Sequence, residues 1–382
     1  MVGIRVDVND IVATGHFMRC ATVADTLIKM GENVIFISAD DEITVFAMER
    51  GFKYHVLHTM WNNLDGEIDT FLEFLRSYND AAQTDGKETI DKLLIDSYQV
   101  TEAYLSKLKN AGYKTTYFDD LNELHYPADL IINYGPGATD MGYHEKYAND
   151  DTKLLLGIKY VPLRKQFQKG SDIFDQKENG PDHGDILDQE ETESGSQTDG
   201  KSHIFLTTGG ADKLGISSVI VQKLINSKVL ANHKLVIHIL AGRLYKVPEE
   251  IKEYISDDIN KIPCVIIHQN VTNVAEIMRM CSAGITPAGT TLFELTACRV
   301  PSVSFVFADN QETDGISFDK MGLIRFAGDY RSDRDKCLNI IEEEIGRLLT
   351  MSAKERTALS VKLRGAIDGN GAEYIASEII KL

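Results

Sequence analysis

Residues 4–37 decide the fold, and they read IRVDVNDIVATGHFMRCATVADTLIKMGENVIFI. Ile4, Val6 and Val8 alternate with polar residues, which is typical of a β-strand. From His16 onward apolar residues recur at helical spacing until Gly31, a residue type that commonly ends helices. Residues 34–37 form a second apolar run. This strand–helix–strand order opens many doubly wound parallel sheets.

The same alternation continues along the rest of the chain and predicts two α/β domains. Short apolar runs of this kind suit parallel strands that are covered on both faces. Between the two series, residues 168–202 contain ten acidic residues, three lysines and a single aromatic residue. Such a composition buries too little apolar surface to offset the entropy of ordering. We therefore predict two doubly wound, Rossmann-like domains, at residues 1–167 and 203–382, joined by an acidic disordered linker and facing a cleft. The expected strands are residues 4–8, 34–37, 93–95, 115–118, 130–132 and 154–156 in the first domain, and 204–206, 235–240, 265–267, 283–285 and 303–306 in the second.

Composition and charge exclude several classes of protein. The formal net charge is -18, which makes nucleic acid and anionic membrane surfaces poor partners. The five cysteines are widely spaced without a CxxC pair, so we expect reduced, buried thiols and no disulfides. The chain has no signal-peptide pattern, no apolar run long enough to cross a membrane, and no metal-binding motif. The expectation is a cytoplasmic protein without a metal or another cofactor and without stable membrane association.

The Gly15-His16 pair stands at the predicted start of the first helix, directly after the first strand. A helix N-terminus offers free N–H groups and a partial positive charge, both suited to anions. Gly15 permits a tight turn and a close ligand approach, and His16 can take a proton from water near neutral pH. Asp7, at the end of the strand, is near enough in principle to orient His16, and Asp7 and Gly15 are candidate substrate-binding residues. On pattern alone, the Gly-His pair favours a capping or surface histidine.

Polar residues follow the other strands of the first domain, where ligands of such sheets bind. Asp96 and Tyr98 come directly after one apolar run, and Asp119-Asp120 and residues 133–135 follow the next two. Acidic groups at these places can bind sugar hydroxyls or hold a general base, although they are also ordinary helix caps.

In the second domain, two glycine-containing turns and one polar segment follow strands. Residues 207–212 and 287–291 suit a phosphate cradle made from backbone N–H groups. Glu294 has the spacing of a capping box from Thr291, and ribose binding is the open alternative. Residues 309–312 can hydrogen-bond a sugar or a phosphate. The candidate residues here are Gly209, Gly210, Gly289, Thr290, Thr291 and Glu294 for the nucleotide, and Asn310 and Gln311 for the substrate.

Taken together, these motifs resemble those of the UDP-2,4-diacetamido-2,4,6-trideoxy-β-L-altropyranose hydrolases of pseudaminic acid biosynthesis. Those enzymes are GT-B-fold relatives of the peptidoglycan GlcNAc-transferase. The likeness rests on Arg5-x-Asp7 and Gly15-His16-x-x-Arg19-Cys20, and on the order of later motifs over both domains. These later motifs are residues 95–98, 118–120, 157–160 with Arg164, 209–212, 289–291 with Glu294, 310–311 and 367–372.

The resemblance implies a GT-B-like fold and a hydrolysis that releases UDP from a UDP-sugar, with water as the acceptor. His16 matches the histidine that activates water, and Tyr98 and Asn310 match positions that contact the substrate. Glu294 matches the carboxylate on the ribose, and residues 268–274 match the segment near the uracil. The sequence departs from the family pattern at Asn9, Ala13, Ser97, residues 286–289 and the acidic insert, which puts the exact sugar in doubt.

Two other functions stay open. In a GT-B glycosyltransferase His16 would deprotonate an acceptor hydroxyl in place of water. Such transferases often carry an apolar and basic docking stretch in the first domain, and the sequence shows none. A nucleotide-sugar binding module without catalysis is the third possibility, and the intact Gly15-His16 pair argues against it.

Overall fold

The chain forms two compact α/β units in a computed structural model. The structure describes residues 1–9, 11–12, 14–168, 200–209, 212–242, 245–308 and 311–382. Residues 1–164 and 369–382 make up the first unit, and residues 165–368 make up the second. Most of the acidic segment predicted as a disordered linker, residues 169–199, lies outside the described residues.

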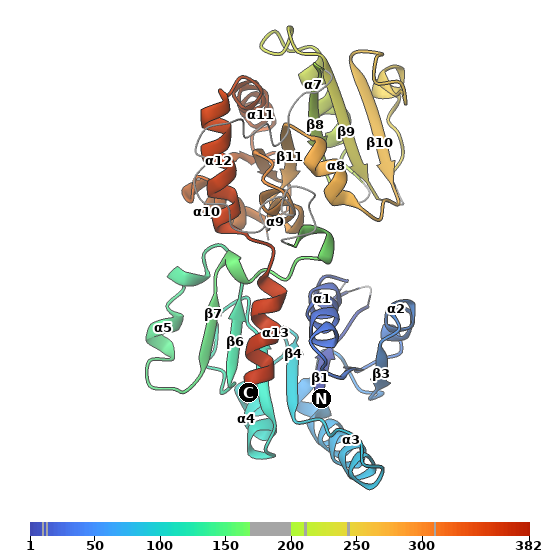
Figure 1. The fold of residues 1–382 in the computed structure, drawn as a ribbon, viewed down its shortest axis with the longest axis vertical. Helices are drawn as coiled ribbons and strands as arrows, with labels where there is room; N and C mark the ends of the chain where they lie inside the picture. The colour runs from blue at the N-terminus through green and yellow to red at the C-terminus, as the bar shows by residue number, and fades with distance from the viewer. Residues whose placement is uncertain (10, 13, 169–199, 210–211, 243–244, 309–310) are drawn as a thin grey trace, which may run out of the picture. The chain divides into compact units, whose positions relative to one another are not determined.

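The first unit is a seven-stranded parallel sheet in the order β3-β2-β1-β4-β5-β6-β7 (Figure 1). Its strands alternate with helices along the chain, as predicted. Its elements are β1 (Val2–Val6), α1 (Gly15–Lys29), β2 (Val34–Ser38), α2 (Ile43–Arg50), β3 (Lys53–Val56), α3 (Leu64–Thr84), β4 (Lys92–Asp96), α4 (Glu102–Asn110), β5 (Lys114–Phe118), β6 (Leu130–Asn133), α5 (Tyr143–Lys146), β7 (Lys153–Leu156) and the last helix, α13 (Gly371–Lys381).

The second unit is a six-stranded parallel sheet in the order β10-β9-β8-β11-β12-β13. Its first strand begins at Ser202, one residue before the predicted start of the second domain. Its elements are β8 (Ser202–Leu206), α7 (Ile216–Ile225), β9 (Leu235–Ala241), β10 (Cys264–Gln269), α8 (Val274–Met280), β11 (Ala283–Pro287), α9 (Thr290–Ala297), β12 (Ser302–Val306), α10 (Glu312–Lys320), β13 (Arg325–Asp329), α11 (Arg334–Leu349) and α12 (Ala353–Ala366).

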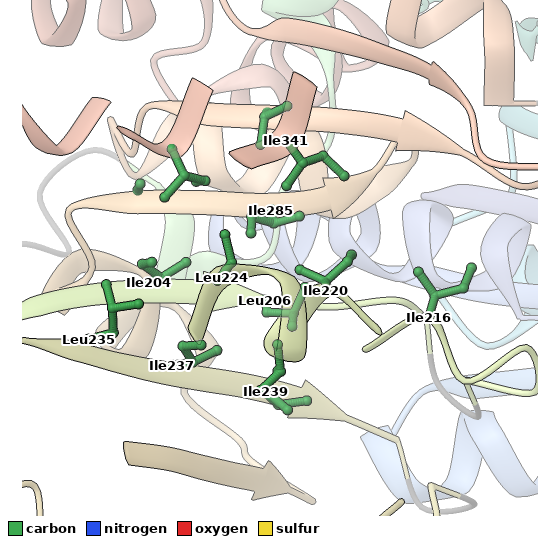
Figure 2. Close-up of a cluster of buried hydrophobic side chains, with 14 of the residues drawn as sticks. Ile204, Leu206, Ile216, Ile220, Leu224, Leu235, Ile237, Ile239, Ile285 and Ile341 are labelled. Carbon is green, nitrogen blue, oxygen red and sulfur yellow. The ribbon is translucent and has the colours of Figure 1, made fainter. Parts of the chain in front are cut away.

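Buried aliphatic side chains hold each sheet to its helices. In the second unit, Ile204 on β8 and Ile237 on β9 pack with Ile220 of α7 and Ile341 of α11 (Figure 2). In the first unit, two apolar clusters cover opposite faces of the sheet, one around α3 and α4 and one around α1. Burial on both faces explains why these strands read as apolar runs.

The last helix differs from the expected domain boundary. Residues 203–382 were predicted to form one domain, but α13 belongs to the first unit. Its Ile375, Ala376 and Ile379 are fully buried in the cluster that contains β1 and α1. The apolar stripe of this amphipathic helix therefore completes the covering of the first sheet (Figure 1).

The strand order places a switch point in each sheet. In the first sheet the order reverses between β1 and β4, and in the second sheet between β8 and β11. Ligands of doubly wound sheets bind beyond the carboxyl ends of the strands at such a point. The switch point of the first sheet is followed by Asp7 and Asp96, and that of the second by Gly209 and Gly289.

Candidate functional site

His16 lies on the first turn of α1 and contacts the end of β4. Its Nδ1 atom is 2.5 Å from Oδ1 of Asp96, and its side chain is 11% exposed. β1 and β4 are neighbouring parallel strands, so their carboxyl ends lie side by side. Because α1 follows β1 in the chain, its first turn lies close to the end of β4. The N-cap residue, Thr14, makes no side-chain capping hydrogen bond, and the first turn has no acidic residue.

Arg19, one turn further along α1, joins two carboxylates. Its Nε and Nη2 donate to Asp96 at 2.6 Å each, and its Nη1 and Nη2 donate to Asp120 at 2.9 Å each. Nη1 also donates to the Tyr134 hydroxyl at 3.0 Å. The guanidinium carbon lies 4.7 Å from the centre of the Phe118 ring. Arg19 entered the sequence analysis only as a motif residue, and the structure makes it the centre of this network.

These contacts keep Asp96 ionised. Burial by itself raises the pKa of Asp96, but Arg19 and then His16 outweigh it and hold the pKa well below the ordinary value. An ionised carboxylate accepts hydrogen bonds and donates none. The proton between Asp96 and His16 therefore belongs to Nδ1, and the neutral ring has its lone pair on Nε2. That nitrogen is the one that can take a proton from a ligand.

A pocket of about 260 Å³ lies at this place in the first unit. The Tyr98 ring meets the His16 ring edge-on at 4.7 Å, and the Tyr98 hydroxyl donates to Asp120 at 3.2 Å. Trp61 is a lining residue that the sequence analysis missed. The pocket is lined by Asp7, Ile11, Val12, His16, Trp61, Asp96, Ser97, Tyr98 and Gln99.

Asp7 does not orient His16, because Asp96 does. Asp7 Oδ1 accepts hydrogen bonds from the Ser38 hydroxyl at 3.0 Å and the Ala39 N–H at 2.9 Å, and it lies 2.7 Å from Nη1 of Arg5. The tight turn expected at Gly15 also needs correction, whereas the close approach of a ligand there stays a prediction. Gly15 lacks a left-handed φ, and an added Cβ would meet nothing within 4 Å, so neither the turn nor packing requires glycine there.

Arg5 connects Asp7 to a second buried carboxylate. Arg5 is fully buried, and its Nε and Nη2 donate to Glu67 of α3 at 2.7 and 2.8 Å. Glu67 also accepts from the Thr59 hydroxyl at 2.8 Å and the Tyr104 hydroxyl at 3.2 Å. Arg5 and Glu67 therefore hold the Asp7 carboxylate in place, and neither of them lines the pocket.

In the second unit, the predicted turn after β11 leads into α9. Gly289 is the N-cap, with an extended backbone and no side-chain capping bond, and the first turn of α9 has no acidic residue. The N-cap is not Thr291, so Glu294 is not part of a capping box there. Glu294 is buried, Thr291 is half-buried and Thr290 is exposed.

Of the four other predicted site residues in the second unit, the structure describes two, Gly209 and Gln311. Gly209 follows β8 with a φ of +88°, a conformation that favours glycine. Gln311 is the N-cap of α10, and its Oε1 accepts from the Phe307 N–H at 3.2 Å. Gly210 and Asn310 lie outside the described residues.

Three histidines stack across β8, β9 and β10, which the sequence analysis did not anticipate. Nδ1 of His203 is 2.9 Å from Nε2 of His238, and Nδ1 of His238 is 3.0 Å from Nε2 of His268. Successive ring centres are 5.2 Å apart. Burial, followed by the two neighbouring rings, lowers the pKa of His238 to about 3. The central ring, His238, is therefore neutral at ordinary pH.

The remaining predictions concern metals, membranes and thiols. All five cysteines are buried and none is paired in a disulfide, as expected. Within the described ranges, no group of three or more acidic, histidine or cysteine residues is placed to hold a metal ion. In the same ranges, no helix has the length and apolarity to cross a membrane.

Comparison with curated proteins finds distant relatives, whereas no family model matches the chain. The uncharacterized protein MJ1062 of Methanocaldococcus jannaschii is 23% identical over 294 residues, which cover 76% of this chain and 52% of that protein. A pseudaminic acid cytidylyltransferase and UDP-2,4-diacetamido-2,4,6-trideoxy-β-L-altropyranose hydrolase of Helicobacter pylori is 22% identical over 261 residues, which cover 68% and 42%. The chain thus spans about half the length of the curated relatives it matches.

Solved structures resemble the whole chain. MurG of Acinetobacter baumannii matches with a TM-score of 0.62 at 11% identity, over 100% of this chain and 99% of that one. A UDP-glucosyltransferase of Polygonum tinctorium matches with 0.59 at 11% identity, over 100% and 98%. The spinosyn rhamnosyltransferase SpnG matches with 0.54 at 14% identity, over all of both chains. The two parallel-sheet α/β domains therefore have the fold of the GT-B glycosyltransferases.

Proposed function

We propose that the chain is a nucleotide-sugar hydrolase that releases UDP from a UDP-linked 2,4-diacetamido-2,4,6-trideoxy hexose. The observation that carries this proposal is the 2.5 Å contact between His16 and Asp96 at the pocket of the first unit. The distant relative from Helicobacter pylori supports the choice of sugar, because its name includes such a hydrolase. Because the chain matches 42% of that protein, it corresponds to part of a protein with two named activities.

In this proposal His16 acts as a general base on water. Nε2 takes a proton from a water molecule, the water oxygen attacks the anomeric carbon, and the bond between that carbon and the diphosphate oxygen breaks. Asp96 stabilises the imidazolium that forms, because its carboxylate is ionised and 2.5 Å from Nδ1. Arg19 fixes the same carboxylate through two 2.6 Å hydrogen bonds, so the base keeps one orientation.

The second unit binds the nucleotide in this proposal. The uncapped start of α9, at Gly289 and Thr290, offers backbone N–H groups to the diphosphate. Glu294, which is not used in a capping box, binds the ribose. The other residues in these roles are Thr291, Gly209 and Gly210 for the nucleotide, and Asn310 and Gln311 for the sugar.

The decisive experiment incubates the full chain with a panel of UDP-linked deoxy-diacetamido sugars and follows UDP release with and without an acceptor. We expect release without an acceptor. His16→Ala and His16→Asn should lower turnover by about a hundred- to ten-thousandfold, the usual contribution of a general base, while UDP still binds. His144→Asn, an exposed histidine on α5, is the matched control. Unchanged turnover in the His16 variants would exclude the assignment.

The alternative of a glycosyltransferase has one observation in its favour. Ile11 is 75% exposed and Tyr98 is 57% exposed, and both line the pocket that contains His16. An apolar acceptor could cover these side chains, and His16 would then deprotonate its hydroxyl. UDP release that requires an acceptor would establish this function. Binding of UDP with no release from any sugar would indicate a binding module.

A further inference from the structure

The pocket of the first unit contains a buried carboxylate oxygen without a partner. Asp7 is 3% exposed, and its Oδ1 is engaged by Ser38, Ala39 and Arg5. Its other oxygen, Oδ2, has no hydrogen-bond partner among the described residues. Buried polar atoms are nearly always paired, so an unpaired one in a pocket points to a missing donor. Oδ2 is an acceptor, so the group that would pair with it is an N–H or O–H donor, which a ligand in the pocket can supply.

Beside this polar carboxylate, the pocket lining also has an apolar part. Trp61, Val12 and Ile11 contribute apolar surface. Asn9 Oδ1 accepts hydrogen bonds from the N–H groups of Ile11 at 3.0 Å and Val12 at 2.8 Å, which orients these two residues. Methyl groups of a ligand would lose water against this apolar surface.

The volume of the pocket limits what it holds. At about 260 Å³ it is smaller than the roughly 300–1,000 Å³ of pockets that enclose a drug-sized ligand. One sugar ring with its substituents fits this range better than a complete nucleotide sugar. The ligand group must offer a hydrogen-bond donor to Asp7 and a methyl group to Trp61 within that space. An N-acetyl substituent carries both, whereas a hydroxyl carries only the donor.

We propose that Asp7 and Trp61 are specificity-determining residues that select N-acetylated sugars. Asp7 Oδ2 accepts a hydrogen bond from the amide N–H, and Trp61 and Val12 cover the acetyl methyl group. This inference rests on the proposed function, because it assigns the sugar end of the nucleotide sugar to the first-unit pocket. It adds Trp61 to the site and narrows the role of Asp7, a candidate substrate-binding residue, to recognition of the N-acetyl group.

The first test uses the only tryptophan of the chain as the reporter. The full chain is titrated with UDP-N-acetylglucosamine, UDP-glucose and UDP while Trp61 emission is recorded. We expect UDP-N-acetylglucosamine to change the emission and to bind about tenfold or more tighter than UDP-glucose, the discrimination typical of a lost donor or methyl contact. Equal affinities and equal emission changes for the two sugars would overturn the proposal.

The second test distinguishes a role of Asp7 in sugar recognition from a purely structural role. Asp7→Asn keeps an oxygen for Ser38 and Ala39 but replaces the acceptor Oδ2 by a donor, so the preference for the N-acetyl sugar should disappear in calorimetric titrations. Glu67→Gln is the matched control, because Glu67 binds the same Arg5 but does not line the pocket. The control should keep the preference. If both variants lose it equally, Asp7 has only a structural role and the proposal fails.

A third pair of variants tests the apolar wall. Trp61→Ala should lower the affinity for UDP-N-acetylglucosamine more than the affinity for UDP-glucose, whereas Met60→Ala should change neither. Met60 is 63% exposed and does not line the pocket. Equal losses for the two sugars in Trp61→Ala would remove Trp61 from the proposal.

The proposed function and this inference can fail separately. A binding preference without UDP release from any nucleotide sugar would refute hydrolysis and support the inference. UDP release that His16→Ala abolishes, with no preference between acetylated and plain sugars in binding or turnover, would support hydrolysis and refute the inference.

Discussion

Each unit buries a cluster of polar side chains beside its sheet, and the two clusters are stabilised in opposite ways. In the first unit, Arg19 binds the carboxylates of Asp96 and Asp120, and the cluster consists of ions. In the second unit, the rings of His203 and His268 flank the ring of His238, which burial keeps neutral. The first cluster contains Asp96, which lines the pocket and contacts His16, whereas the second is a stack of rings across three strands.

The difference teaches what each cluster can do. Buried ions that are fully paired can hold a neighbouring base in one orientation and take up the charge it acquires. The histidine stack gains little from a new charge, because the folded structure resists protonation of its central ring, His238. We therefore expect changes in the first cluster to affect catalysis and stability strongly, and changes in the second to affect mainly the response to acid.

The largest effect should come from Asp96→Asn. Asparagine keeps the size of the side chain but cannot stabilise an imidazolium on His16, so turnover should fall by about a hundred- to ten-thousandfold. The measurement is UDP release as a function of pH. Asp129→Asn is a suitable control, because Asp129 accepts from Lys114 and Thr115 outside the pocket. Wild-type turnover in Asp96→Asn would mean that the contact between Asp96 and His16 has only a structural role.

The next effect should come from Arg19→Met. The variant leaves Asp96 buried without its main cation, and breaking such a pair costs about 3–5 kcal/mol of the free energy of unfolding. Urea unfolding followed by Trp61 fluorescence reports this loss, because Trp61 belongs to the first unit. Arg50→Met removes a partly exposed pair with Asp25 and should cost about 0.2–1 kcal/mol. Similar losses in the two variants would mean that the buried network is no stronger than a surface pair.

The histidine stack should make the second unit sensitive to acid. The pKa of His238 is lowered by burial from 6.5 to about 3, so the unfolded chain binds a proton in this window and the folded chain does not. Stability is full above pH 6.5 and falls as the pH drops towards 3, by at most about 1.4 kcal/mol per pH unit.

The measurement compares unfolding free energies between pH 4.5 and 7 for the wild type and His238→Phe. The variant cannot titrate at this position, so its slope should be smaller, although its stability at pH 7 should fall by about 1–3 kcal/mol because the outer rings lose their partners. His144→Asn should keep the wild-type slope. Identical slopes in His238→Phe and the wild type would contradict a neutral His238 in the folded state.

The sequence predicted the central strands because their physical signal is local. β4, β6 and β8 are buried on both faces, and each appears as an apolar run. The sequence missed two of the four edge strands, β3 and β13, because they lack such a run, whereas the edge strands β7 and β10 keep one and were predicted. Lys53 and Tyr54 are exposed on β3, and Arg325 is exposed on β13.

The site was predicted in its positions but only partly in its contacts. The rule that ligands bind beyond the carboxyl ends of strands placed His16, Asp96 and Tyr98 together. Which carboxylate meets His16 depends on the strand order, and in that order β4 lies beside β1. No local pattern contains this information. The pairing of Arg5 with Glu67 and the position of Trp61 depend in the same way on segments far apart in the chain.

The smallest effect should come from Tyr98→Phe, which tests how far the charged cluster extends. The Tyr98 hydroxyl donates to Asp120 at 3.2 Å, but Arg19 already binds both oxygens of that carboxylate. Tyr98 is also 57% exposed, so water can replace the lost donor. The free energy of unfolding should therefore change by less than about 1 kcal/mol. Because phenylalanine keeps the ring beside His16, UDP release should stay within about tenfold of the wild type, one lost hydrogen bond being worth about 1 kcal/mol. A loss as large as that of Asp96→Asn would show that the hydroxyl, and not only the ring, belongs to the reacting centre.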